Sequence, residues 1–154
     1  FGNAATLAGH VDVHDWAIVN AYSGVHQFCR VGEHAFVGGY TVATKDALPF
    51  SKVVGNRACI YGINGVGLQR RGFSRERVSA IRKAYRVLVQ SRLNTSAALA
   101  RLEAEGPFTE HLAGHIAFIR PSRRRMSTKP RPPWGPKPTR TRAPPRRCRI
   151  ARNS

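Results

Sequence analysis

Aliphatic residues recur at every sixth position near the start of the sequence, and this period restricts the fold more than any other feature. An α-helix repeats about every 3.6 residues and an ordinary strand every two, so neither produces it. A six-residue period is the signature of a parallel β-helix, in which three hexads close one triangular coil. A series of ordinary sandwich strands is the weaker alternative. The aliphatic column is Leu7, Val13, Val19, Val25, Val31 and Val37, and the column of small residues is Ala5, Val11, Ala17, Ser23, Cys29, Ala35 and Thr41. We expect the five valines of the aliphatic column to be buried inside the coils.

A third column with the same period carries mostly aromatic rings. Three hexads per coil place residues 18 apart on one face, so we expect His10 to stack with Phe28 and Trp16 with His34. The simpler interpretation is a stabilising ladder on the outer surface. The alternative is a groove where the outer faces of neighbouring subunits meet. The column is His10, Trp16, Tyr22, Phe28, His34 and Tyr40.

The hexad register ends before the middle of the chain, and a helical pattern replaces it. The register breaks between Lys45 and Phe50, where a proline indicates a loop, and residues 51–56 read as a last strand. Ser74 is a suitable N-cap for an amphipathic helix. Further helices are predicted from about residue 95 and from about residue 107 to 119. The apolar face of the first helix is Val78, Ile81, Ala84, Tyr85, Leu88 and Val89.

Composition separates a basic tail from the rest of the chain. Residues 121–154 contain twelve Lys or Arg, no Asp or Glu, and eight of the ten prolines, so residues 1–120 carry only +6 of the net charge of +18. Such a tract buries too little apolar surface to fold, and we predict disorder. It would bind nucleic acid or an anionic membrane nonspecifically if at all, and we favour an unselected tail.

These patterns divide the chain into four predicted segments. They are β-helix coils at 1–56, with earlier coils expected before Phe1, a Gly-rich connection at 57–73, a helical C-terminal domain at 74–120, and the disordered tail at 121–154. No apolar run reaches the 18 residues of a membrane span. Cysteines 29, 59 and 148 share no metal or redox spacing. We therefore expect the protein to bind no metal and no cofactor, and to be located in the reducing cytoplasm.

Several short motifs resemble those of one protein family over about 120 residues. They are "NAATLAGHVDV", "GVHQFCRVGEHAFVGGYT", "GNRA", "YGIN" and "GLQRRGFSRE". Together they resemble the acyl-acyl carrier protein:UDP-N-acetylglucosamine O-acyltransferases of lipid A biosynthesis. The resemblance implies a left-handed β-helix, a helical C-terminal domain and a cytoplasmic homotrimer with active sites between subunits. It also implies transfer of a 3-hydroxyacyl chain from acyl carrier protein to the 3-hydroxyl of UDP-N-acetylglucosamine.

The same resemblance assigns roles in acyl transfer. Gly9 matches a glycine whose backbone N–H donates to the oxyanion, and His10 matches a histidine that helps to position substrate. His26 and Gln27 match polar residues that contact the ligand. Gly39 matches a position that helps to set acyl length, and a glycine there favours a longer chain. The family's general base lies in a coil upstream of "LAGH", so we expect this chain alone to be inactive.

Nucleotide contacts are expected further along. By resemblance Asn64 contacts the nucleotide, and Arg70 with Arg71 binds near the uridine and diphosphate, in keeping with the bidentate fit of guanidinium to phosphate. An acidic residue common in the family is Val66 here, so one nucleotide contact is in doubt. Two alternatives stay open: a nucleic-acid-binding protein acting through its tail, and a hexapeptide acyltransferase that uses acyl-CoA. The "RRGFSRE" motif favours the lipid A family over a hexapeptide acyltransferase that uses acyl-CoA.

Overall fold

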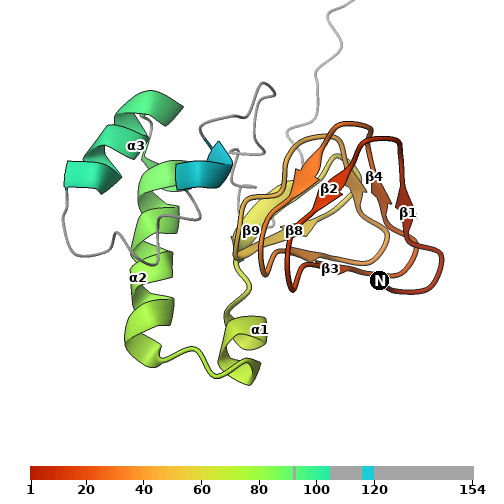
Figure 1. Ribbon diagram of the computed structural model, residues 1–154, viewed down its shortest axis with the longest axis horizontal. Coiled ribbons are helices and arrows are strands. Elements are labelled where there is room, and N and C mark those ends of the chain that lie inside the picture. Colours follow the sequence, from red (N-terminus) through yellow and green to blue (C-terminus); the bar gives the residue numbers. More distant parts are fainter. Residues whose placement is uncertain (92, 105–115, 120–154) are drawn as a thin grey trace, which may run out of the picture.

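Short strands form three sheets, and helices follow them in a computed structural model that describes residues 1–91, 93–104 and 116–119. The sheets lie on one side and the helices on the other (Figure 1). The strands are β1 (Thr6–Leu7), β2 (Asp12–Val13), β3 (Ile18–Val19), β4 (Gly24–Val25), β5 (Arg30–Val31), β6 (Phe36–Val37), β7 (Val42–Ala43), β8 (Ser51–Val54) and β9 (Cys59–Ile63). The helical elements are α1 (Gly65–Arg70), α2 (Arg75–Tyr85), the π-helical η1 (Arg86–Gln90) and α3 (Thr95–Ala104).

Strand pairing follows the predicted 18-residue repeat. The sheets have the orders β1-β4-β7, β2-β5 and β3-β6-β8-β9, and all pairs except β8-β9 are parallel. Leu7 pairs with Val25, and Val19 with Val37, each 18 residues further on. Phe36 pairs with Lys52 instead, an offset of 16. The predicted break in register between Lys45 and Phe50 is therefore confirmed.

The aliphatic column fills the interior of these coils. Val19, Val31 and Val37 are fully buried and Val25 nearly so. Val13 is only partly buried, which corrects the prediction that all five valines are buried, because no described residues pair with the free side of β2. Leu7, in the edge strand β1, is exposed for the same reason. Strand β3 is also at an edge, but there the Gly2 N–H donates to the Val19 carbonyl at 2.7 Å, so residues before β1 cover Val19. In the small column, Ser23, Cys29, Ala35 and Thr41 are buried.

The ring column makes the turns between strands, which the period alone did not reveal. Its six residues all have a left-handed backbone, with φ between +52° and +60°. This conformation is uncommon for residues other than glycine, and it directs each ring outward from the coil. The predicted stacking is confirmed: His10 lies 4.9 Å from Phe28 and Trp16 lies 6.5 Å from His34, between ring centroids.

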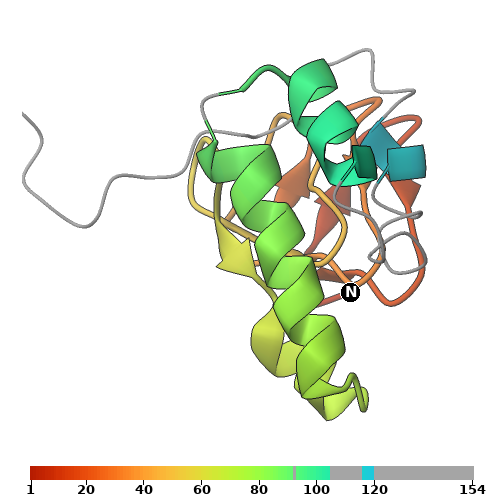
Figure 2. The same cartoon turned by 90° about the vertical axis from the view of Figure 1, so that its left-hand side faces the viewer.

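The first predicted helix, α2, begins where expected. The Ser74 side chain accepts a hydrogen bond from the Arg77 N–H at 3.2 Å and caps α2. Helix α2 continues into η1 and runs alongside the sheets (Figure 2). Helix α3 begins at Thr95, as expected. The third predicted helix lies mostly outside the described residues, although 116–119 are helical.

The segment at 57–73 contains more structure than the predicted Gly-rich connection. Strand β9 pairs antiparallel with β8, and α1 follows it directly. One apolar cluster joins the coils to the helices, since Val53 and Ile60 belong to the same buried core as Ala84 and Phe118. Within the described ranges, no helix has the length and apolar character needed to cross a bilayer.

Candidate functional site

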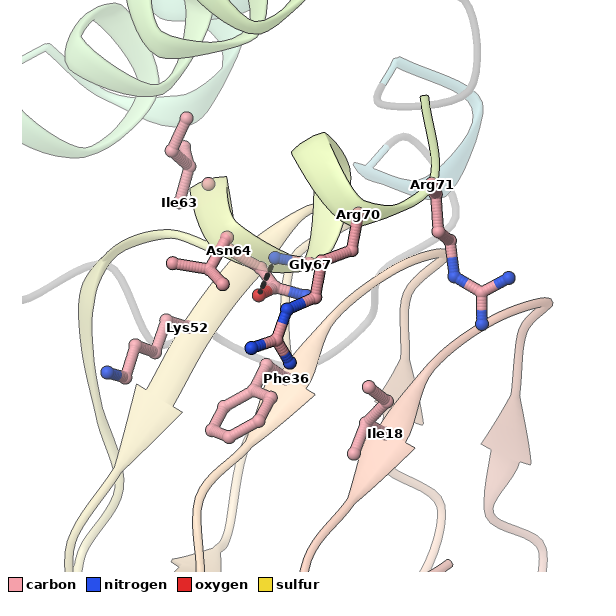
Figure 3. A pocket seen from close by; sticks show the side chains of 10 residues that line it. Ile18, Phe36, Lys52, Ile63, Asn64, Gly67, Arg70 and Arg71 are labelled. Carbon is pink, nitrogen blue, oxygen red and sulfur yellow. Dashed lines mark hydrogen bonds between the residues drawn. The ribbon is translucent and has the colours of Figure 1, made fainter. Parts of the chain in front are cut away.

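A pocket of about 620 Å³ lies where α1 meets the outer faces of β3 and β6 (Figure 3). Apolar side chains contribute one part of its lining and three cations contribute another. No acidic side chain lines it among the described residues. A pocket of this kind suits an anionic ligand that also has an apolar or planar part. The lining is Ile18, Phe36, Lys52, Ile63, Asn64, Gly65, Val66, Gly67, Arg70 and Arg71.

Asn64 shapes the wall of this pocket and caps α1. Its side-chain oxygen accepts a hydrogen bond from the Gly67 N–H at 3.2 Å, drawn as a dashed line in Figure 3. Its Nδ2 donates to the backbone oxygen of His34 at 3.1 Å. A Cβ at position 67 would collide with the Asn64 side chain, so the cap requires glycine there. Two of the hydrogen-bonding positions of Asn64 therefore serve the fold, and the others remain for a ligand.

The two predicted arginines end α1 and lie differently. Arg71 is the C-cap residue, and its N–H donates to the carbonyls of Gly67 and Leu68 at 3.2 and 3.1 Å. Its guanidinium lies over the Trp16 ring, 4.0 Å from the centroid. Arg70 is in the last turn of α1, and both arginines are exposed. Figure 3 shows both side chains extending from α1 toward the strands.

His34 connects the coils to the start of α2 and is buried. Its ring stacks on Phe50, with centroids 5.6 Å apart, and meets Phe73 edge-on at 5.0 Å. Burial lowers the pKa of the imidazole below its usual value. Nearby Glu33, 3.4 Å from Nε2, partly offsets that effect, while Arg71 and Arg77 lower the pKa further. His34 is therefore a neutral ring at pH 7.

Four of the other predicted residues lie at a different corner of the triangular coil. The Gly9 carbonyl accepts a hydrogen bond from the Phe28 N–H at 3.1 Å, and His10 stacks on Phe28. His26 and Gln27 immediately precede Phe28 and are exposed. Gly9 is exposed too, and a Cβ added there would meet nothing within 4 Å. This corner is thus open to a ligand.

Gly39 lies at the third corner, beside the stacked rings of Tyr22 and Tyr40, which are 5.2 Å apart. A Cβ at position 39 would come within 3.3 Å of the Ala21 carbonyl oxygen. Of the predicted site residues, the pocket of one chain therefore contains only Asn64, Arg70 and Arg71. The remaining predicted residues lie at the other two corners.

Several residues that line the pocket were not predicted from the sequence. Ile18 and Phe36 are paired 18 residues apart on β3 and β6, so the repeat itself could have placed them on one outer face. Lys52 pairs with Phe36 across the break in register, and its Nζ lies 5.8 Å from the Phe36 ring. No local pattern predicts that neighbour, because the 16-residue offset comes from the loop before β8.

Comparisons with known proteins agree with the motifs. Residues 46–127 match the family model described as "Udp N-acetylglucosamine O-acyltransferase; Domain 2". The chain is 47% identical over 120 residues to an acyl-[acyl-carrier-protein]–UDP-N-acetylglucosamine O-acyltransferase of Alkalilimnicola ehrlichii, covering 76% of this chain and 46% of that protein. Over 90 residues it is 53% identical to the Aliivibrio fischeri protein of the same name, covering 58% of this chain and 34% of that protein. The chain spans about half the length of the first of these relatives.

Solved structures lead to the same family. The UDP-N-acetylglucosamine acyltransferase of Bacteroides fragilis superposes with a TM-score of 0.78 at 41% identity, covering 81% of this chain and 49% of that one. The Francisella novicida enzyme superposes with a TM-score of 0.75 at 36% identity, covering 85% and 47%. These matches favour neither the nucleic-acid-binding alternative nor an acyltransferase of another hexapeptide family. The chain therefore belongs to the family of UDP-N-acetylglucosamine O-acyltransferases.

Proposed function

We propose that this chain supplies part of an enzyme that transfers a 3-hydroxyacyl chain from acyl carrier protein to the 3-hydroxyl of UDP-N-acetylglucosamine, the first step of lipid A biosynthesis. The names of its relatives support both substrates. The nucleotide binds at the pocket of α1, where Arg70 and Arg71 receive the diphosphate and Asn64 contacts the nucleotide. The apolar face of Ile18 and Phe36 suits a planar group beside those charges.

The second corner supplies the groups for acyl transfer. The Gly9 backbone N–H donates to the oxyanion that develops as the sugar oxygen attacks the thioester. His10 positions substrate, and His26 with Gln27 contacts the ligand. Gly39, at the third corner, leaves room for a long acyl chain. We assign the general base to none of the described residues, because the family places it upstream of the position that Gly9 matches.

The observation that carries the proposal is the separation of these groups. The residues of one site fall at different corners of one triangular coil, so a site that uses them together needs more than one chain. We infer a left-handed parallel β-helix with a helical C-terminal domain, assembled as a cytoplasmic homotrimer in which neighbouring subunits close each site. In analytical ultracentrifugation, a monomer at micromolar concentration would contradict the assembly.

The test of function uses a fusion, because the chain spans about half of its relatives. The coils that precede the matching "LAGH" region in the Alkalilimnicola ehrlichii relative are joined ahead of Phe1. Transfer of a labelled 3-hydroxyacyl group from acyl carrier protein to UDP-N-acetylglucosamine is then expected. His10→Ala in the fusion should reduce the rate. If a folded fusion transfers nothing while the intact relative is active, the proposed function is wrong.

A further inference from the structure

Trp16 lies next to the pocket without lining it. Its backbone is left-handed, with φ of 59°, and its side chain is 59% exposed. Arg71, which lines the pocket, contacts the face of the Trp16 ring. Its guanidinium carbon is 4.0 Å from the ring centroid. A large exposed ring in a left-handed turn with a cation on its face needs an explanation, and aromatic stacking with His34 does not account for the guanidinium.

A stack of rings supports Trp16. His34 lies 6.5 Å away and nearly parallel, with an angle of 18° between the rings. His34 itself is buried against Phe50 and Phe73. Phe73 in turn is held by its N–H, which donates to the Leu68 carbonyl at 3.1 Å. The indole is therefore held in place by residues of the coil and of the segment after α1.

A stacked guanidinium keeps its hydrogen-bonding edge free. Cation–π attraction acts through the face of the group, whereas its N–H donors point outward in the plane and remain available to phosphate oxygens. An arginine side chain that is free in solution loses much rotamer freedom when it binds an anion. A ring that already holds the guanidinium reduces that loss, which is the general advantage of preorganisation.

We propose that Trp16 is a positioning residue that holds the Arg71 guanidinium ready for the diphosphate of the nucleotide sugar. This assignment rests on the proposed nucleotide site. It distinguishes the two arginines, both of which are exposed: the Arg71 guanidinium lies on the Trp16 ring, and Arg70, in the last turn of α1, makes no such ring contact among the described residues. Arg71 accordingly contributes a fixed donor and Arg70 an adaptable one.

The test is a double-mutant cycle on the full chain, with UDP as the probe in titration calorimetry. Trp16→Leu is expected to weaken binding about two- to fivefold, the range of a cation–π contact at an exposed site. Trp16→Phe keeps a smaller aromatic face and is expected to recover part of the affinity. In an Arg71→Ala background, Trp16→Leu is expected to have no further effect.

Tyr22→Leu is the matched control. Tyr22 stands one hexad after Trp16, has the same left-handed backbone and the same 59% exposure, and stacks on Tyr40 as Trp16 stacks on His34. The Arg71 guanidinium lies over Trp16, at a different corner of the coil from Tyr22. Tyr22→Leu is therefore expected to leave UDP affinity unchanged.

A second readout needs no ligand. The indole ring current should shift the Arg71 Nε–Hε proton resonance upfield, and Trp16→Leu should remove that shift while Trp16→Phe reduces it. If the parent chain does not bind UDP, the proposed nucleotide site is wrong and this assignment falls with it. If the parent chain binds UDP and Trp16→Leu binds it equally well, only the assignment to Trp16 is overturned. The same holds if Trp16→Leu weakens UDP binding as much in the Arg71→Ala background as in the parent. If Trp16→Leu does not fold, the Trp16→Phe variant decides. An Arg71 Nε–Hε resonance at the same position in Trp16→Phe as in the parent chain would overturn the assignment to Trp16.

Discussion

At the scale of single residues, the contribution of Arg71 is separable from the general positive potential of the chain. Arg71 lines the pocket, whereas Arg75 begins α2 and is exposed outside the pocket lining. We expect Arg71→Ala to weaken UDP-N-acetylglucosamine binding by about 1–3 kcal/mol, the scale of a charge-assisted hydrogen bond. Arg75→Ala should change it little. Equal losses in calorimetry would show that net charge, and no specific contact, holds the nucleotide.

His34 gives the folded chain a pH dependence with a definite sign. Burial lowers its pKa in the folded chain, while the unfolded chain keeps the ordinary value near 6.5. Between the two pKa values the unfolded chain binds more protons, so acid favours unfolding. This contribution to stability is complete above about pH 6.5 and is lost as pH falls through the pKa of the folded state.

The measurement is the free energy of unfolding between pH 8 and 5, from denaturant titrations. His34→Phe keeps a ring between Trp16 and Phe50 but removes the titrating group. We expect the parent chain to lose stability more steeply toward acid than this variant does. Parallel curves for the two proteins would show that His34 is not responsible.

At the scale of elements, the buried column and the outward positions of the same coils should respond differently to truncation. Val31 in β5 is fully buried, whereas Val42 in β7 is 40% exposed. Val31→Ala should lower the free energy of unfolding by about 1–3 kcal/mol, through lost burial and a residual cavity. Val42→Ala should change it by less than about 0.5 kcal/mol. Urea denaturation measures both, and similar values would contradict the assigned interior.

At the scale of the whole molecule, one arginine joins the coils to the segment at 116–119. Arg30 donates to the buried carboxylate of Asp46 through Nε and Nη2 at 3.3 and 3.2 Å. Nη2 also donates to the Phe118 carbonyl at 2.6 Å, and the guanidinium lies 4.2 Å from the Phe118 ring centroid. The Arg30 guanidinium therefore links Asp46, in the loop before β8, to Phe118, which lies 88 positions after Arg30 in the chain.

Arg30→Ala should destabilise the fold strongly. It removes the guanidinium partner of a buried carboxylate, a change that typically costs about 3–5 kcal/mol. Arg82→Ala, on the exposed side of α2, is the control and should cost less than about 0.5 kcal/mol. Thermal unfolding followed by circular dichroism compares them. A loss at Arg30 no larger than at Arg82 would show that this contact does not hold the two parts together.

The sequence by itself determined what repeats and what is local. The six-residue period predicted the parallel pairing of Val19 with Val37 and the stacking of His10 on Phe28, because a side chain's place in a repeating coil depends only on its position in the hexad. The N-cap at Ser74 followed from neighbouring residues alone. The family motifs pointed to Asn64 and Arg71, two residues that the pocket does bring together.

The tertiary structure decided what depends on contacts between distant segments. Strand β9 forms inside a Gly-rich stretch because β8 offers it an antiparallel partner. Lys52 reaches the pocket because the loop before β8 shortens the repeat to 16 residues. The Asn64 cap also bonds to His34, 30 positions earlier, and Arg71 meets Trp16 only after α1 returns to the coil. A hydrophobic period records which residues face inward, whereas these contacts arise from how separate elements pack.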